Sequence, residues 1–209
     1  MKRRLFSTLL AFCTLLGCTI SVRAVNETGF SDVPLDAWYA DAVAFCHENG
    51  LMSGTTATTF SPNDTMTRGM LVTVLYREAG APSLENENLG YPFADVPGDL
   101  WYANGVYWAR LKGITSGYAD NRFGPNDPVT REQLAVILWR SAGSPAPEAE
   151  SAFADQSSIS AYAVDAVRWA RESGIVRGKD GNRFDPAGQA TRAETAAILT
   201  RWIAFRQNG

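Results

Sequence analysis

One ordered set of motifs occurs three times along this chain at a nearly constant spacing. Each copy opens with a Phe-x-Asp element, continues to a Phe-x-Pro step and closes with a Thr-Arg pair. The opening Asp and closing Arg are 36, 36 and 37 residues apart, as Asp32 and Arg68, Asp95 and Arg131, and Asp155 and Arg192. A period of about 50 to 60 residues is typical of modules that are stabilised by their neighbours. We therefore assign repeats to residues 30–80, 93–143 and 153–203.

Each repeat is predicted to hold two helices around a polar loop. The first helix carries apolar residues three to four positions apart and ends at a glycine, and the second begins after a threonine N-cap. Gln133 and Glu194 complete capping boxes in repeats two and three, whereas repeat one has Met70 there and a weaker cap. The predicted fold class is all-α, with three helix-loop-helix units. The second helices supply the shared core through Leu71, Val74, Leu75, Leu134, Ile137, Leu138, Ala197, Ile198, Arg201 and Trp202.

The first 24 residues differ from the rest of the chain. A basic stretch at residues 2–4 precedes an apolar run, and residues 22–24 fit a small-residue cleavage pattern, so residues 1–24 predict an export signal. Residues 15–18 also resemble a lipoprotein box, in which Cys18 would be lipidated. Both cuts stay open. Either one places the protein outside the cytoplasm, with membrane contact only through a lipid on Cys18.

Composition and charge narrow the function classes. A chain with 45% hydrophobic residues can bury a sizeable core. Without residues 1–24 it has 15 basic and 22 acidic residues, a net charge of about −7. Such a surface lacks the broad positive field on which nucleic-acid binding depends. Cys46 is then the only cysteine, so no internal disulfide is expected, and its place on an apolar helix face favours a small buried side chain.

The threonine caps put an arginine at the first position of each second helix. Backbone N–H groups at a helix start have no partner within the helix, and a guanidinium holds carboxylate or phosphate. We interpret these three helix ends as anion sites. The alternative is an ion pair with the repeated Asp residues, and the two roles are compatible. The residues concerned are Arg68, Arg131, Arg192, Asp32, Asp95 and Asp155.

Large aromatic residues occupy equivalent places at the start of each first helix. They are Trp38, Trp101 and Tyr162. Such side chains either form a wall for a carbohydrate-like ligand or bury most of their area in the core, and the sequence leaves both interpretations open.

The ordered motifs resemble the S-layer homology repeat of bacterial cell-surface proteins. They run Phe-x-Asp-Val-Pro, Trp-Tyr, Ala-Val, Asn-Gly-Leu-x-x-Gly, Phe-x-Pro and Thr-Arg over residues 30 to about 203. The resemblance implies a pseudo-threefold bundle whose grooves bind a secondary cell-wall polymer linked to peptidoglycan, often through a pyruvylated, carboxylate-bearing sugar. It implies export to the cell surface. The binding residues that it implies are Asp32, Trp38, Gly54, Arg68, Asp95, Trp101, Gly117, Arg131, Asp155, Tyr162, Gly178 and Arg192.

Departures from the family pattern predict unequal grooves. Repeat one has Gly69-Met70 where the family favours Ala-Glu, and repeat three has Tyr162 in place of Trp. The groove that uses Arg131 is therefore the expected working site. Arg131→Ala is expected to weaken wall binding without unfolding the protein.

Catalysis, a cofactor and a metal site are not expected. His47 is the single histidine and has no repeat equivalent, and the equivalent carboxylates number one per repeat rather than the pair that glycoside hydrolysis needs. Residues 120–121 and 180–182 hold calcium-loop residue types without the calcium-loop spacing, and they fit turns. The alternative function is also non-catalytic: a protein–protein interaction module, or an S-layer or adhesin subunit, that uses the same scaffold on a cell-surface protein.

Overall fold

The computed structural model describes residues 28–85, 93–148 and 152–208 of the 209-residue chain. The predicted export signal and the choice between secretion and lipidation lie outside these residues. Within them, regular structure consists of six α-helices and three short 3-10 helices, with isolated bridges but no strand. The all-α prediction is confirmed. In this described part of the chain, no helix combines the length and the apolar character that a membrane crossing requires.

Each repeat contributes two α-helices, in the order that the sequence predicted. They are α1 (Ala40–Glu48) and α2 (Arg68–Glu78), α3 (Ala103–Leu111) and α4 (Arg131–Ser141), and α5 (Val164–Glu172) and α6 (Arg192–Asn208). The third repeat adds η1 (Gln156–Ser158), η2 (Ala161–Ala163) and η3 (Asp180–Asn182). Trp38 and Trp101 precede α1 and α3 instead of opening them, and Tyr162 lies in η2.

The caps of the second helices follow the prediction. The Oγ1 of Thr67 accepts the Met70 N–H at 3.3 Å, and the threonines before α4 and α6 do the same for the third helical residue. In α4 and α6 that residue also accepts the threonine N–H, at 3.2 and 3.1 Å, which completes the capping boxes of Gln133 and Glu194. The α2 cap lacks this second bond because a methionine offers no oxygen acceptor.

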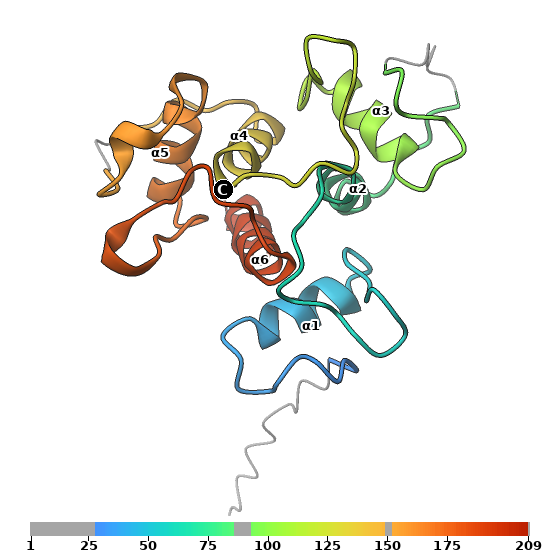
Figure 1. The fold of residues 1–209 in the computed structure, drawn as a ribbon, viewed down its shortest axis with the longest axis horizontal. Coiled ribbons are helices and arrows are strands. Elements are labelled where there is room, and N and C mark those ends of the chain that lie inside the picture. Colours follow the sequence, from blue (N-terminus) through green and yellow to red (C-terminus); the bar gives the residue numbers. More distant parts are fainter. Residues whose placement is uncertain (1–27, 86–92, 149–151, 209) are drawn as a thin grey trace, which may run out of the picture.

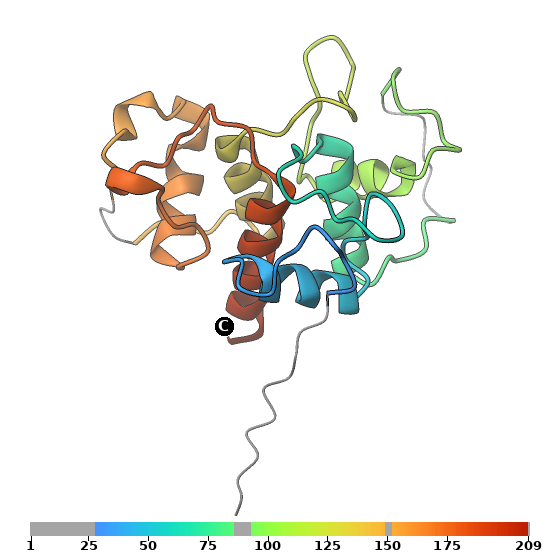
Figure 2. The same ribbon diagram turned by 60° about the horizontal axis from the view of Figure 1, so that its bottom comes forward.

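Helices pair mainly across repeat boundaries. α2 packs against α3, α4 against α5, and α6 against α1, so the last repeat returns to the first. Figure 1 shows α2, α4 and α6 near the centre and α1, α3 and α5 outside them. In Figure 2, α1 lies across the lower half of α6. These contacts close the three units into a ring. Their pseudo-threefold relation stays a prediction.

Three backbone hydrogen bonds tie the repeats together where the chain enters the second helices. The Met66 N–H donates to the Ala190 carbonyl at 2.8 Å, Ala190 donates to Val129 at 3.0 Å, and Val129 donates to Met66 at 2.9 Å. The side chains of all three residues are fully buried. Because buried N–H groups need partners, each repeat satisfies the backbone of another.

The second helices supply the centre of the core, as predicted, except at one position. Arg201 does not join the apolar face of α6; it is half-buried at a groove, and Leu199 takes the core position. Cys46 is buried, and burial, partly opposed by a hydrogen bond with Thr200, raises the pKa of its thiol to about 11. The fully buried side chains of these helices include Leu71, Leu75, Leu134, Leu138, Leu199 and Trp202.

Leu199→Ala is expected to lower the free energy of unfolding by about 2–5 kcal/mol, because it leaves a cavity at a fully buried site. Urea denaturation measures this loss, and Leu111→Ala, at an exposed position of α3, is the control. Since α1 packs on α6, amide hydrogen exchange should accelerate in both helices. Unchanged protection of α1 would contradict the closed ring.

Candidate functional site

The repeated aspartates hold the Phe-x-Pro loops of their own repeats. Asp32 accepts the N–H groups of Phe60 and Ser61, both at 2.7 Å. Burial raises the pKa of Asp32, but the backbone donors more than offset it, so the pKa lies below the ordinary value of 3.8. The pKa of Asp155 is lowered for the same reasons. The equivalent bonds elsewhere join Asp95 to Phe123 and Gly124, and Asp155 to Phe184 and Asp185.

Each repeated arginine contacts the phenylalanine of the Phe-x-Pro step in a neighbouring repeat. The Arg192 Nε donates to the Phe60 carbonyl at 2.8 Å, and its guanidinium lies 4.4 Å from the centre of that ring. Arg68 does this at Phe123 and Arg131 at Phe184. Among the described residues no ion pair joins these arginines to the repeated aspartates. The ion-pair interpretation is therefore wrong.

The N–H groups at the starts of the second helices already have partners. At α6, the N–H of Arg192 donates to Asp64 at 2.9 Å and that of Ala193 donates to Pro62 at 3.0 Å, while the third N–H meets the threonine cap. The starts of α2 and α4 pair in the same way with loops of the next repeat. The expectation of open anion sites at these helix ends is wrong, because the groups serve the contacts between repeats. An anion must be held by side chains.

The three repeated glycines shape the loops above these contacts. Gly117 has a φ of +73°, and a Cβ there would collide with the Phe93 ring. A Cβ at Gly54 would lie 2.6 Å from the Phe30 ring, and one at Gly178 would lie 3.2 Å from the Phe153 ring. The glycines therefore let each loop approach the first phenylalanine of its own repeat.

Two grooves each combine one motif residue from every repeat. A groove of about 1000 Å³ between α1, α6 and residues 177–180 is lined by Trp38, Arg131 and Gly178. A smaller one of about 160 Å³ beside α2 is lined by Trp101, Arg192 and Gly54. We name them the α1–α6 groove and the α2 groove. The structure thus groups the predicted site residues across repeats, not within them.

The remaining set of motif residues, Tyr162, Arg68 and Gly117, differs from the other two through its tyrosines. The Tyr118 ring lies 4.8 Å from the Arg68 guanidinium. The Tyr162 hydroxyl donates to Glu132 at 2.9 Å, and burial followed by this bond raises the pKa of Tyr162 to about 12. The protein's own side chains therefore engage both the arginine and the aromatic residue of this set.

The repeated aromatic residues do not pack in the core. Trp38, Trp101 and Tyr162 are 68%, 60% and 53% exposed. The core interpretation is wrong for all three, and in two of them an exposed ring lines a groove that also holds a buried arginine.

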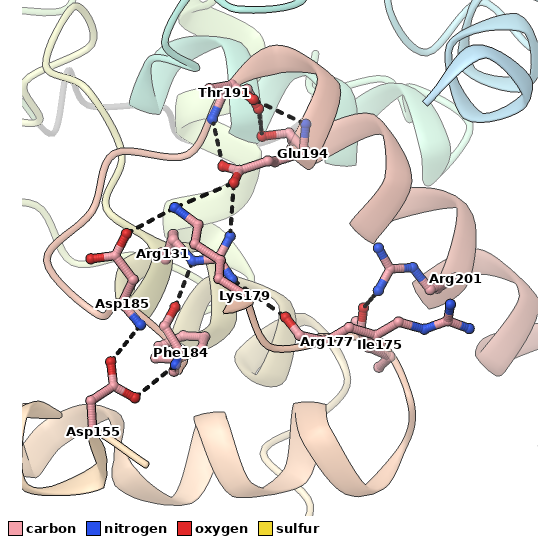
Figure 3. A network of polar contacts seen from close by, with 11 residues as sticks. Arg131, Asp155, Ile175, Arg177, Lys179, Phe184, Asp185, Thr191, Glu194 and Arg201 are labelled. Carbon is pink, nitrogen blue, oxygen red and sulfur yellow. Dashed lines mark hydrogen bonds and ion pairs between the residues drawn. The ribbon is translucent and has the colours of Figure 1, made fainter. Parts of the chain in front are cut away.

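Arg131 uses all three of its nitrogens inside the protein (Figure 3). Its Nε donates to the Phe184 carbonyl at 2.7 Å, its Nη2 donates to the Arg177 carbonyl at 3.5 Å, and its Nη1 lies 3.3 Å from Glu194. The residue is only 5% exposed. Arg131→Ala would remove contacts between repeats two and three, so it tests stability as much as binding.

The sequence missed three cations of the α1–α6 groove: Arg177, Lys179 and Arg201. The sequence could have identified Arg201 as a repeated position, because Arg77 and Arg140 stand at equivalent positions. It could not have identified Arg177 and Lys179 in this way, because the other repeats carry no cation there. In the described residues no cluster of three or more His, Cys, Asp or Glu side chains has metal-binding geometry.

A family model described as the S-layer homology domain matches residues 29–69, 92–135 and 152–196. The chain belongs to the S-layer homology family. Proteins of this family occur at the cell surface in association with the cell wall, and their repeats are anchoring modules.

Similar proteins include enzymes and surface-layer proteins. An endoglucanase of Bacillus sp. (strain KSM-635) is 33% identical over 84% of this chain, and an amylopullulanase of Thermoanaerobacterium thermosulfurigenes is 34% identical over 81%. A surface-layer 125 kDa protein of Lysinibacillus sphaericus is 34% identical over 61%. The matches span only 19%, 9% and 11% of the length of these relatives. The similarity therefore does not assign the activity of the two enzymes to this chain.

Acid is expected to weaken the aspartate contacts. Because the pKa values of Asp32 and Asp155 lie below 3.8 in the folded state, their stabilisation is present above about pH 4 and is lost as the pH falls through the folded values. Urea denaturation from about pH 6 to about pH 2 should show a smaller loss in the double variant Asp32→Asn, Asp155→Asn. An equal loss in variant and parent would refute this assignment.

Gly117→Ala is expected to destabilise the protein by about 2 kcal/mol or more, since it adds a positive-φ strain to a collision with Phe93. Gly178→Ala is the matched comparison, because its Cβ would meet neighbours only at 3.2 Å or beyond. Thermal unfolding of both variants measures the difference. A larger effect at Gly178 would contradict the loop geometry.

Proposed function

We propose that this protein attaches to the cell wall by binding an anionic secondary polymer, linked to peptidoglycan, in the grooves between its repeats. The polymer is a carboxylate-bearing, pyruvylated polysaccharide. One observation carries the proposal: the exposed ring of Trp38 lines the same groove as Arg131, Arg177, Lys179 and Arg201.

That combination suits an acidic sugar better than most other ligands. A flat aromatic face offers apolar contact to the C–H groups of a sugar ring, and cations hold its carboxylate through charge-assisted hydrogen bonds. A volume of about 1000 Å³ lies at the upper end of the range for small-molecule pockets, so it accommodates more than one sugar unit. In an acidic protein, an anionic polymer depends on such a local concentration of cations rather than on the net field.

The proposed ligand residues divide into three roles. Trp38, Trp101 and Tyr162 are the exposed contact residues. The repeated aspartates and glycines, by contrast, hold and shape the loops. Arg68, Arg131 and Arg192 join repeats through their Nε atoms, and in the two grooves the arginine also lines the cavity.

The relatives support wall attachment as the shared activity. Their names range from endoglucanase to surface-layer protein, whereas the part that they share with this chain contains the S-layer homology repeats. An attachment module serves proteins of such different kinds, and a catalytic one does not. We extend that role to this chain.

The competing function is attachment to a protein, as in a surface lattice or an adhesin. The same exposed aromatic rings would then contact a protein surface. Treatment of the wall with protease separates the two, because it removes a protein partner and leaves the polymer intact.

The protein is expected to pellet with purified, protease-treated sacculi of its source organism and to stay in solution after the polymer is chemically stripped from them. Trp38→Ala should weaken this binding about three- to tenfold, which corresponds to the binding free energy that one aromatic contact typically contributes. The melting temperature should not fall. Leu35→Ala, at a neighbouring exposed position, is the control. Equal pelleting with stripped and unstripped sacculi would refute polymer binding.

A further inference from the structure

The cations of the α1–α6 groove differ in how far the protein itself neutralises them. Glu194 lies 3.3 Å from Arg131 and 3.5 Å from Lys179, and Asp185 lies 2.8 Å from Lys179. These two cations are therefore compensated. Figure 3 shows this part of the network, with Glu194 between the side chains of Arg131 and Lys179.

Arg177 and Arg201 lack such compensation. Arg201 donates its Nε to the Ala197 carbonyl and its Nη1 to the Ile175 carbonyl, both at 2.9 Å, so it is held in place by neutral groups. Arg177 is exposed. In the described part of the chain, neither guanidinium forms an ion pair with a carboxylate. Asp41 and Asp180 also line the groove.

Arg177 and Arg201 both line the α1–α6 groove. Figure 3 shows Arg201 above the loop that carries Arg177, with its guanidinium at the Ile175 carbonyl. Burial, followed by the charges of Arg177 and Arg131, lowers the pKa of Arg201. Like charges at such a place repel each other, and an anion between them would remove the repulsion.

This pair is particular to one groove. Arg201 has equivalents in Arg77 and Arg140, but the positions equivalent to Arg177 hold Ser53 and Ser116. The α2 groove is lined by Arg77 and Arg192, and Ser53 stands there at the position equivalent to Arg177. The common motif therefore does not account for the pair.

We propose that Arg177 and Arg201 together hold a carboxylate of the wall polymer, which makes the α1–α6 groove selective for acidic polymer segments. The inference rests on the proposed function and adds to it a subsite outside the repeated motif. Arg201, which is held in place, binds one side of the carboxylate. The exposed Arg177 binds the other side.

Arg177→Ser tests this subsite, because serine is the residue that the other two repeats carry there. Cosedimentation with protease-treated sacculi should show binding about tenfold weaker than that of the parent, and a shallower dependence on salt. Arg110→Ser removes the same charge from an exposed position of α3 outside both grooves and should bind like the parent. Arg177→Lys should restore part of the loss.

A second arm identifies the group that is bound. Amidation of the polymer carboxylates on the sacculi should abolish the difference between parent and Arg177→Ser; a difference that persists would overturn the carboxylate assignment. Equal binding of parent and Arg177→Ser to untreated sacculi would overturn the subsite and leave the proposed function standing. Failure of the parent itself to distinguish intact from stripped sacculi would instead refute the proposed function.

Discussion

The structure depends on one arrangement, in which the phenylalanine of each Phe-x-Pro step is held by two repeats at once. An aspartate of its own repeat accepts its N–H, and an arginine of a neighbour donates to its carbonyl and lies over its ring. Both partners are charged, so each bond is stronger than one between neutral groups. Three such contacts, together with the backbone ring through Met66, Val129 and Ala190, make each repeat a structural part of the others.

The grooves follow from this closure. Because Arg131 and Arg192 each cross a boundary between repeats, they meet the glycine loop of one neighbour and the exposed aromatic residue of the other. A single repeat contains all of these residues but cannot assemble them. The same arginine thus joins repeats and lines a groove, which explains why stability and binding cannot be separated by removing it. The differences between grooves come from positions outside the motif, where Lys179, Tyr118 and Thr55 stand at equivalent places.

The sequence predicted the helices, caps and repeat boundaries because these depend on local spacing. It also identified the aromatic, glycine and arginine positions, since threefold recurrence exposes them. It was wrong about the helix ends, because a sequence does not show that the Asp64 and Pro62 carbonyls pair with the first N–H groups of α6. It missed Arg177 and Lys179, since a search for recurring residues passes over cations that occur once. Arg201 was misplaced in the core because helical spacing alone does not reveal a cavity beside the helix.

We propose that the polymer binds between repeats, in the α1–α6 groove. The most direct measurement is a crystal structure of the protein soaked with acidic disaccharides released from the secondary wall polymer of its source organism. We expect a sugar ring against Trp38 with its carboxylate toward the groove cations. Sugar bound away from the grooves, or contacts with only one repeat, would contradict this proposal.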